Sequence, residues 1–305
     1  MLALALNPSH SYLLAISGGG DSMALAYLAH TQGYKVAWAH VHHGWNTADD
    51  EACALVSQQA QALGVKLHIQ RLKGGKPAHN AEAHARTARY AFFKECCETH
   101  GYAGVVLAHT QTDLAETFLM RAGKGSGVSG LAAMPAVTAR EGLALYRPLL
   151  STTREQLRAY LVQQGLAWHE DPENLAGGNQ RAKLRALLPA LAEAGVPVHG
   201  LAAAAHALAR AEAALVSHES TVLQGADIAD MPLAPLLQQS PELTLRHMAK
   251  VMKTYFPHQL PPRTSKRLAF LERLKQQPEG QATLGGLIWR WRKGWLRVWP
   301  ESPKS

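Results

Sequence analysis

Cysteine is scarce in this chain, and its spacing fits neither a disulfide framework nor a cysteine metal site. There are three cysteines among 305 residues, and Cys96 and Cys97 are adjacent. An odd number with an adjacent pair excludes a normal disulfide framework, and no Cys-x-x-Cys pair occurs. We therefore expect Cys53, Cys96 and Cys97 to be reduced, packed thiols of a cytoplasmic protein.

Long hydrophobic runs are also absent. The opening stretch Met1 to Leu6 is apolar but short, carries no basic leader and runs into Pro8, which is typical of neither a signal peptide nor a membrane span. Hydrophobic residues make up 47% of the chain and charged residues 18%, so we expect a globular protein without a membrane partner.

Acidic residues are outnumbered, since the formal net charge is +8. The excess is uneven: residues 1–70 hold two basic and four acidic side chains, whereas residues 281–305 hold five basic and one acidic. A basic excess outside the N-terminal part favours a polyanionic partner such as nucleic acid. A generally basic globular protein would show the same net charge.

The two commonest nucleotide-binding signatures are missing, because no Gly-x-Gly-x-x-Gly occurs and no Gly-Lys-Ser/Thr follows a glycine-rich turn. A different turn is present, Ser17-Gly18-Gly19-Gly20-Asp21-Ser22, between an apolar strand pattern and a helix pattern. Three glycines let backbone N–H groups converge on an anion, and the two hydroxyls add donors. Asp21 would repel phosphate unless a cation lay between them, which indicates Mg²⁺. A glycine-rich turn without a ligand is the alternative.

Strand patterns alternate with helix patterns through the first half of the chain. This alternation predicts an α/β fold, a doubly wound parallel sheet with helices on both faces. Ligands bind beyond the carboxyl ends of such strands, where three stretches should converge: Ser17 to Ser22, His40 to Gly44 and His109 to Asp113. Gly195 and Pro197 suggest a junction, so we expect domains at 1–195 and 196–305, the second mainly helical and ending in a β-hairpin.

Two acidic residues, Asp113 and Glu116, are three apart at the start of a predicted helix and should share one side of its first turn. They could hold magnesium, bind an ammonium group or accept a proton from an amine. A charge pair that only stabilises the helix N-terminus is equally compatible with this spacing. Just upstream, His109 is expected in the strand-end loop.

Three further patterns carry candidate ligand contacts. Arg86, Arg89 and Tyr90 share a helical face with Glu82 and could point arginines toward phosphate, although pairing of Glu82 with Arg86 would explain the spacing too. Four glycines between Gly123 and Gly130 predict a mobile active-site loop without regular structure. The C-terminal hairpin interleaves basic residues with tryptophans, which suits phosphate contact with base stacking or, alternatively, a tryptophan-packed core.

With these motifs together, the sequence resembles the tRNA(Ile)-lysidine synthetases, which belong to the N-type ATP pyrophosphatase or PP-loop family with its adenine nucleotide alpha hydrolase-like fold. Beyond the turn at Ser17 to Ser22, the resemblance runs in order through the N-terminal 190 residues: Val41-His42-His43-Gly44, Asn80-x-Glu82-Ala83-x-x-Arg86 with Arg89-Tyr90, Ala108-His109, Asp113-x-x-Glu116-Thr117, Arg121, Gly125-Ser126-Gly127, Gly130-Leu131-x-x-Met134, Arg147-Pro148-Leu149-Leu150, Trp168, Asp171 and Arg181-x-x-x-Arg185.

The resemblance implies an ATP-dependent ligase of the cytoplasm. Such an enzyme adenylates the C2 oxygen of the wobble cytidine of a tRNA with a CAU anticodon, and the ε-amine of free L-lysine then displaces AMP. By position, the resemblance implies catalytic roles for Asp21, Asp113 and Glu116, with Mg²⁺ on Asp21 and Asp113 and ATP on Ser17 to Ser22. Substrate or tRNA contacts are implied for His109, Arg86, Arg89, Arg121, Arg147, Arg181 and Arg185.

The chain departs from the family at two places. Thr112-Asp113-Leu114 stands where two aspartates and a glutamine are common, and Ala182-Lys183 stands where asparagine and arginine are usual. These departures leave open a catalytically silent nucleotide-binding or tRNA-binding module. A tRNA-thiolating enzyme with the same turn is a second alternative, although its cytidine-thiolating branch needs Cys-x-x-Cys pairs. A homodimer is left open.

Overall fold

The computed structural model describes residues 2–72, 75, 77, 80–170, 180–222, 229–257, 259 and 261–301, without the side chains of residues 82 and 219–222. Contacts divide the chain into two compact units, Met1–Ala209 and Arg210–Ser305. The division falls inside α9 (Val198–Val222) and not at the junction expected after residue 195, because Leu201, Ala202 and Ala205 of that helix are buried in the first unit. The different roles expected for the two parts stay a prediction.

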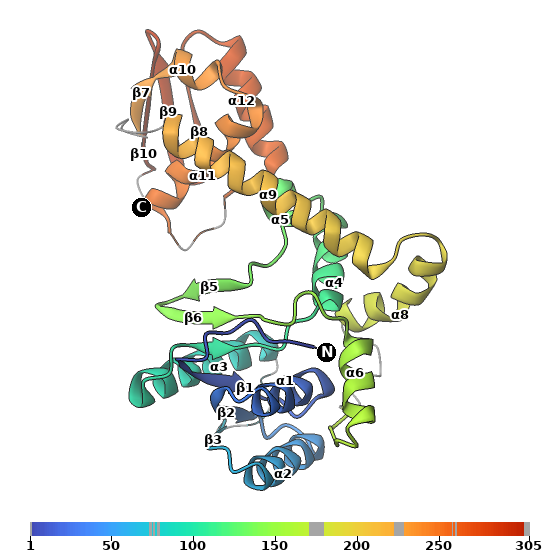
Figure 1. Ribbon diagram of the computed structural model, residues 1–305. Coiled ribbons are helices and arrows are strands. Elements are labelled where there is room, and N and C mark those ends of the chain that lie inside the picture. Colours follow the sequence, from blue (N-terminus) through green and yellow to red (C-terminus); the bar gives the residue numbers. More distant parts are fainter. Residues whose placement is uncertain are drawn as a thin grey trace. The chain divides into compact units, whose positions relative to one another are not determined.

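The first unit is built on a six-stranded sheet in the order β3-β2-β1-β4-β6-β5 (Figure 1). All neighbouring pairs are parallel except β5 with β6. The expected α/β sheet is therefore confirmed, with an antiparallel edge hairpin that the sequence patterns did not reveal. The strands are β1 (Ser11–Ala15), β2 (Lys35–His42), β3 (Leu67–Arg71), β4 (Val105–Val106), β5 (Val137–Arg140) and β6 (Leu143–Tyr146).

Helices cover both faces of this sheet. Successive side chains of a strand point to opposite faces. Leu14 of β1 accordingly packs with α1 and α6, whereas Leu13 packs with Phe93 of α3. The helices of this unit are α1 (Gly20–Thr31), α2 (Thr47–Ala62), α3 (Ala81–His100), α4 (Gln111–Ala122), α5 (Val128–Leu131), α6 (Arg154–Gln163), α8 (Gln180–Glu193) and the first part of α9.

Two local expectations are wrong. The glycine-rich stretch after α4 contains regular structure, because Gly123 to Ser126 form a turn closed by backbone bonds to Arg121 and Ala122, and α5 follows. Helix α8 also continues past Pro189, where the sequence predicts its end. Pro189 is exposed on this helix.

The second unit packs three helices with a four-stranded antiparallel sheet in the order β7-β10-β9-β8. The expected C-terminal hairpin is confirmed as β9 (Leu287–Arg292) and β10 (Trp295–Pro300). It is the centre of a sheet and not an isolated hairpin, because β8 (Gly280–Leu284) and β7 (Asp230–Pro232) pair with its two edges. The helices packed with the sheet are α10 (Leu233–Leu237), α11 (Pro241–Tyr255) and α12 (Thr264–Gln276), and residues 210–222 of α9 also belong to this unit.

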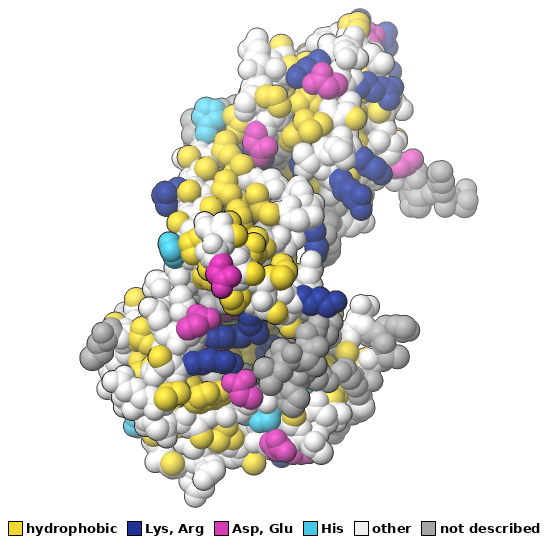
Figure 2. Space-filling model, turned by 90° about the vertical axis from the view of Figure 1, so that its right-hand side faces the viewer, with side chains coloured by type: hydrophobic (Ala, Val, Ile, Leu, Met, Phe, Trp, Pro, Cys, Tyr) yellow, Lys and Arg dark blue, Asp and Glu magenta, His cyan; other side chains and the backbone are white. Residues whose placement is uncertain are grey.

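Two of the hairpin tryptophans belong to the core of this unit. Trp289 and Trp291 are fully buried, and their indole N–H groups donate to the carbonyls of Leu284 and Gln277. Strand alternation places Arg290, Arg292 and Arg297 on the exposed face. The tryptophan-packed interpretation is therefore confirmed for this pair, while Trp295 is 51% exposed. On the molecular face drawn in Figure 2, basic side chains lie interspersed with acidic and apolar ones.

The three cysteines are buried and free, as expected. Burial raises the pKa of Cys97 to about 11, so this thiol stays protonated and unreactive near neutrality. Within the described part of the chain, no single helix is long and apolar enough to cross a membrane. Only α8 together with Val198–His218 reaches that length and composition, as a pair bent by 103°.

Candidate active site

The turn between β1 and α1 presents an unblocked helix N-terminus. Gly19 is the N-cap of α1 and contributes no side-chain cap, and the first intrahelical bond runs from the Met23 amide to the Gly19 carbonyl. The Ser22 hydroxyl donates to the same carbonyl at 2.8 Å and lies 3.1 Å from the Ser17 hydroxyl. The N–H groups at the start of α1 are therefore available to an anion, and the serines hold the turn in shape.

Glycine is favoured at Gly18 by its backbone conformation, and Gly20 lies in contact with a neighbouring ring. Gly18 has φ +92°, and a Cβ there would lie 3.2 Å from Ala52 Cβ of α2. A Cβ on Gly20 would lie 3.4 Å from the indole of Trp168. The turn is thus pressed between α2 and the segment after α6, which also bonds it through the His169 amide to the Gly18 carbonyl at 2.9 Å.

The three stretches expected to converge do so around one cleft of about 720 Å³ within the first unit. Its lining includes Ser17 and Gly19 to Ser22 from the turn, His40, Val41 and His43 from the end of β2, Ala108 and His109 from the loop before α4, and Asp113 from the first turn of α4. The expectation of a shared cleft is therefore confirmed.

Asp21 is paired with an arginine that the sequence motifs did not include. Arg154 Nε lies 2.9 Å from Asp21 Oδ2, and a second guanidinium nitrogen bonds the same oxygen. Burial raises the pKa of Asp21, while Arg154 acts in the opposite direction. Arg154 therefore supplies a cation beside the phosphate-binding turn, in the place where the sequence suggested a metal alone.

Asp113 and Glu116 share one side of α4, as expected, because Arg181 Nη1 lies 3.9 Å from Asp113 and 3.5 Å from Glu116. Their environments differ. Asp113 is in a capping box, where its Oδ2 accepts bonds from the amide and hydroxyl of Thr110, both at 2.8 Å. Glu116 is fully buried and accepts from Arg185 Nε at 2.7 Å. Asp113 lines the cleft, whereas Glu116 lies outside its lining and holds Arg185, which lines it.

Positive charge surrounds His109. Burial lowers the pKa of His109, and Arg147, Arg181 and Arg86 lower it further, against the opposite effect of Asp113. The imidazole is therefore neutral near pH 7, and its buried Nδ1 has no hydrogen-bond partner among the described residues. A neutral histidine beside these cations is available as a hydrogen-bonding group for a substrate.

The remaining expected arginines divide into two groups. Arg86, Arg89 and Arg185 line the cleft; Arg86 also stacks on Tyr90, and Arg89 contacts His43. Arg121 and Arg147 lie outside its lining and bind backbone, Arg121 at the Gly130 carbonyl (2.8 Å) and Arg147 at the Pro135 carbonyl (2.9 Å). In this structure Arg121 therefore fastens α5, and Arg147 fastens the segment after it. The side chain of Glu82 and the whole of Asp171 fall outside the described residues.

The sequence motifs do not include the residues that α6 and the following segment bring to the cleft, namely Arg154, Glu155, Arg158, His169 and Glu170. One signal was present in the sequence. Arg154 and Arg158 open a helix with positive charge, where the helix dipole disfavours it. Thr112, at one of the departures from the family, is buried, and its hydroxyl accepts from the Arg154 amide at 3.3 Å.

The donor set fits one magnesium ion shared with a phosphate. Side chains of Asp21 and Asp113 are 16% and 14% exposed, and the charge of Asp113 contributes to the raised pKa of Asp21. The hydrogen bonds to Arg154 and Thr110 engage Oδ2 of each carboxylate, while Asp113 Oδ1 lies 3.9 Å from Arg181 Nη1 and Asp21 Oδ1 accepts no hydrogen bond from the described residues. Mg²⁺ commonly uses one or two carboxylates plus phosphate oxygens and water. Across the described residues, no group of three His, Cys, Asp or Glu side chains forms a metal site by itself.

Comparison with known proteins places this cleft in a family. The PP-loop domain family matches residues 2–191. The tRNA(Ile)-lysidine synthase of Bradyrhizobium sp. is 42% identical over 208 residues, which cover 66% of this chain and 58% of that protein. The synthase of Rhodopseudomonas palustris is 34% identical over 87% of this chain and 80% of its own length. The chain thus spans less than two thirds of the Bradyrhizobium relative.

Among solved structures, the U34-tRNA thiolase NcsA of Methanococcus maripaludis with its [4Fe-4S] cluster is similar in fold. Its TM-score is 0.54 at 17% identity, over 70% of this chain and 74% of the thiolase chain. At this identity the likeness concerns the fold alone.

Proposed function

Because the chain belongs to the PP-loop domain family, and within it to the tRNA(Ile)-lysidine synthases, we propose that it ligates lysine to C2 of the wobble cytidine of a tRNA(Ile) with a CAU anticodon. ATP would adenylate the C2 oxygen, and lysine would displace AMP, with pyrophosphate as the other product. The observation that carries the proposal is the cleft in which an open helix N-terminus, two carboxylates and several arginines meet.

The phosphate end of ATP belongs at the turn from Ser17 to Ser22 in this proposal. The amides at the start of α1 would bind phosphate oxygens, and Arg154 and Arg185 would offset their negative charge. When bound to Asp21 and Asp113, Mg²⁺ would supply charge neutralisation to the departing pyrophosphate. Arg154 would then exchange part of its bond with Asp21 for a bond to phosphate.

The amine chemistry requires a carboxylate that can meet an ammonium group. Free lysine has a side-chain pKa of about 10.4, so it enters the cleft as a cation and must lose a proton before it attacks. Asp113 lies in the cleft with one oxygen uncommitted to the capping box, and we assign it the ammonium contact. Glu116, which is buried against Arg185, is assigned to positioning that arginine.

The RNA end of the substrate is assigned to the arginines on α3 and α8. Arg86, Arg89 and Arg185 line the cleft, while Arg181 is 45% exposed beside Asp113. Phosphates of an anticodon loop would meet these side chains, and neutral His109 would hydrogen-bond the target base. Arg121 and Arg147 support this surface by fastening the segment behind it.

The decisive experiment measures incorporation of labelled lysine into unmodified tRNA(Ile) with a CAU anticodon, together with release of AMP and pyrophosphate. Other amino acids and a methionine tRNA with the same anticodon serve as controls. Lysine-specific, ATP-dependent incorporation would support the proposal. Pyrophosphate release without any lysine transfer, or no tRNA-dependent turnover of ATP, would contradict it. A silent module would give the second result, and sulfur transfer in place of lysine would identify a thiolase.

A further inference from the structure

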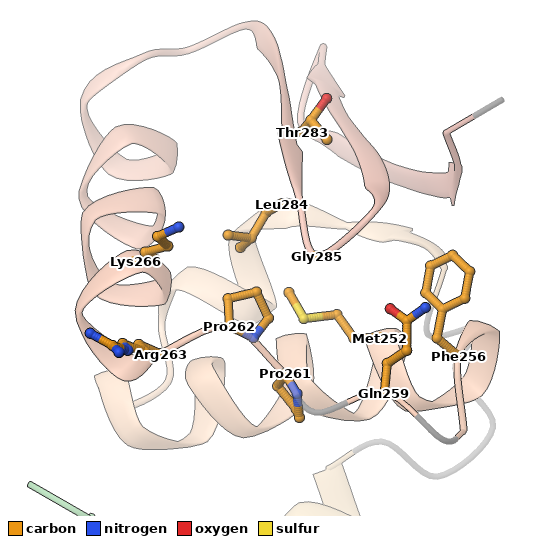
Figure 3. A pocket seen from close by; sticks show the side chains of 10 residues that line it. All are labelled: Met252, Phe256, Gln259, Pro261, Pro262, Arg263, Lys266, Thr283, Leu284 and Gly285. Carbon is orange, nitrogen blue, oxygen red and sulfur yellow. The ribbon is translucent and has the colours of Figure 1, made fainter. Parts of the chain in front are cut away.

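A second cavity lies entirely within the unit Arg210–Ser305. Its volume is about 730 Å³, and it is built by the end of α11, the segment that joins α11 to α12, the start of α12, and the end of β8 with the turn that follows it (Figure 3). The lining residues are Met252, Phe256, Gln259, Pro261, Pro262, Arg263, Lys266, Thr283, Leu284 and Gly285. None of them lines the cleft of the first unit.

The floor of the cavity is apolar and aromatic. Met252 and Leu284 are buried, and Phe256 and the two prolines are half-buried at its wall. Figure 3 shows Phe256 at one side, with the Gln259 amide beside it and the Met252 thioether in the middle. A flat ring entering here would meet an aromatic face, a polarisable sulfur and an amide that can both donate and accept hydrogen bonds.

The hairpin turn packs bare backbone against this floor. Gly285 and Gly286 have φ of +65° and +75°, so the two-residue turn needs left-handed backbone at both positions. A Cβ on Gly285 would lie 2.9 Å from the Met252 sulfur, and one on Gly286 would lie 3.3 Å from the Phe256 ring. The turn therefore approaches both side chains more closely than other residues would allow.

The opposite side of the cavity is basic. Arg263 and Lys266 are exposed, and Figure 3 shows the Lys266 amine directed toward Leu284, with Arg263 at the edge. Neither has an ion-pair partner among the described residues, and none of the ten lining residues is acidic. Residues 210–305 as a whole contain fourteen basic and eight acidic side chains. The charge of both the cavity and its unit is therefore complementary to an anion.

We propose that this cavity binds one unpaired nucleotide of an RNA strand, with the base against Phe256 and Met252 and its phosphate at Lys266 and Arg263. A nucleotide combines the two chemistries that the cavity separates, a flat aromatic ring and a phosphate. A bare anion would leave the aromatic side unused, and an apolar peptide would leave the cations unpaired. The proposal deepens the proposed function, on which it rests, by adding a tRNA contact outside the cleft of the first unit.

The first test locates the bound base. The full-length protein is irradiated with a single-stranded RNA hexamer that carries 5-iodouridine, and the cross-linked peptides are sequenced. We expect a cross-link at Phe256 or Met252. Cross-links confined to residues 1–209 would overturn the proposal.

The second test separates base from phosphate by affinity. Phe256→Leu removes the aromatic face and keeps an apolar side chain, and it should weaken binding of the hexamer about fivefold or more. Binding of a hexamer with abasic sites should not change. Lys266→Glu should weaken both hexamers and reduce the log-log salt slope by about 0.7. The matched control is Lys250→Glu, an exposed lysine of α11 outside the cavity lining.

Equal losses of affinity in Lys266→Glu and Lys250→Glu would reduce the effect to general electrostatics and overturn the proposal. An unchanged preference of Phe256→Leu for the base-containing hexamer would do the same. Thermal melting of each variant verifies that the unit is folded. Failure of the proposed function looks different: a wild-type protein that transfers no lysine yet shows the Phe256 cross-link would contradict the function and leave this cavity assigned.

Discussion

For Asp21, the structure shows a partner that the sequence did not indicate. The sequence indicates that a carboxylate inside an anion-binding turn needs a cation, and it suggests Mg²⁺. The structure places Arg154 on that carboxylate, although 133 positions separate the two residues in sequence. Such a pair could not be found from spacing, because only the tertiary fold brings the start of α6 to the start of α1. The role of Asp21 as a metal ligand and its ion pair with Arg154 can be tested separately.

Asp21→Asn should retain the fold and lose about a hundredfold in tRNA-dependent pyrophosphate release, because the amide keeps the shape of the turn while the charge that anchors the metal disappears. The measurement is pyrophosphate release across a range of Mg²⁺ concentrations, beside thermal melting. Glu95→Gln, the same change at an exposed position of α3, is the control. Normal release at limiting Mg²⁺ would remove the metal role from Asp21 and leave its ion pair with Arg154 as its function.

His40 predicts a pH dependence of stability. It is buried with Nδ1 bonded to the Ile16 carbonyl, and burial lowers its pKa from the ordinary value of 6.5. Below pH 6.5 the unfolded chain takes up this proton more readily than the folded protein does. The contribution to stability is therefore fully present above that pH and is lost as the pH falls below it.

His40→Asn, whose amide can replace the bond to Ile16, should show a smaller drop in melting temperature between about pH 7.5 and pH 5.5 than the wild type. The same change at His206, an exposed residue of α9, should leave the drop as it is in the wild type. If His40→Asn and the wild type lose the same number of degrees, the acid sensitivity resides in other buried histidines, such as His43 and His109.

At the scale of elements, the buried strands of the sheet could be predicted from the sequence, whereas its edge hairpin could not. The apolar run from Lys35 to His42 indicates the strand β2, because strands buried between helices need apolar side chains on both faces. The edge hairpin of β5 and β6 was missed, since its outer strand is half exposed and carries little apolar pattern. Its turn signal, Glu141-Gly142 with φ of +52° and +82°, was nevertheless present in the sequence.

The start of α4 shows what spacing alone left undecided. Thr110-x-x-Asp113 is a capping-box pattern, so the sequence contained the structural role of Asp113 along with its candidate chemical one. The structure commits only Oδ2 to the capping box with Thr110, whereas Oδ1 stays outside the box and lies 3.9 Å from Arg181 Nη1. The two interpretations of this carboxylate are therefore compatible.

Thr110→Ala tests this dual role. Loss of the cap should destabilise the first unit by about 1 kcal/mol and leave Asp113 without the partner that orients it, so lysine transfer should fall more than stability explains. Ser240→Ala removes the N-cap of α11 in the second unit and is the matched control, with a similar helix penalty expected and no direct effect on transfer. Equal activity in the two variants at a temperature where both are folded would confine Asp113 to capping.

At the scale of the whole molecule, the question is which of the excess basic side chains contact RNA. The sequence proposes the C-terminal hairpin, and its three arginines do lie on the exposed face. Two of them have acidic neighbours, because Arg297 lies 3.1 Å from Asp230 and Arg292 lies 3.4 Å from Glu279. Exposed pairs of this kind are weak, so a phosphate could replace either partner. Arg290 lies opposite Arg297 in the strand register, without an acidic residue between them.

Replacing Arg290, Arg292 and Arg297 together by alanine should therefore weaken tRNA binding and lower its log-log salt slope by roughly 0.7 to 0.9 for each phosphate that the variant no longer binds. Arg290 should account for the largest single share, because the other two arginines must first leave a carboxylate. ATP binding should not change, since the cleft lies in the other unit.

The control triple variant, Lys250→Ala with Lys253→Ala and Lys275→Ala, removes the same charge from this unit without touching the hairpin. If both triple variants reduce the tRNA affinity and the salt slope equally, the unit attracts tRNA through its overall positive charge and not through the hairpin. If the hairpin variant binds tRNA as the wild type does, the hairpin serves to close the sheet over Trp289 and Trp291, and RNA contact rests on the arginines of the cleft and on the cavity at Lys266.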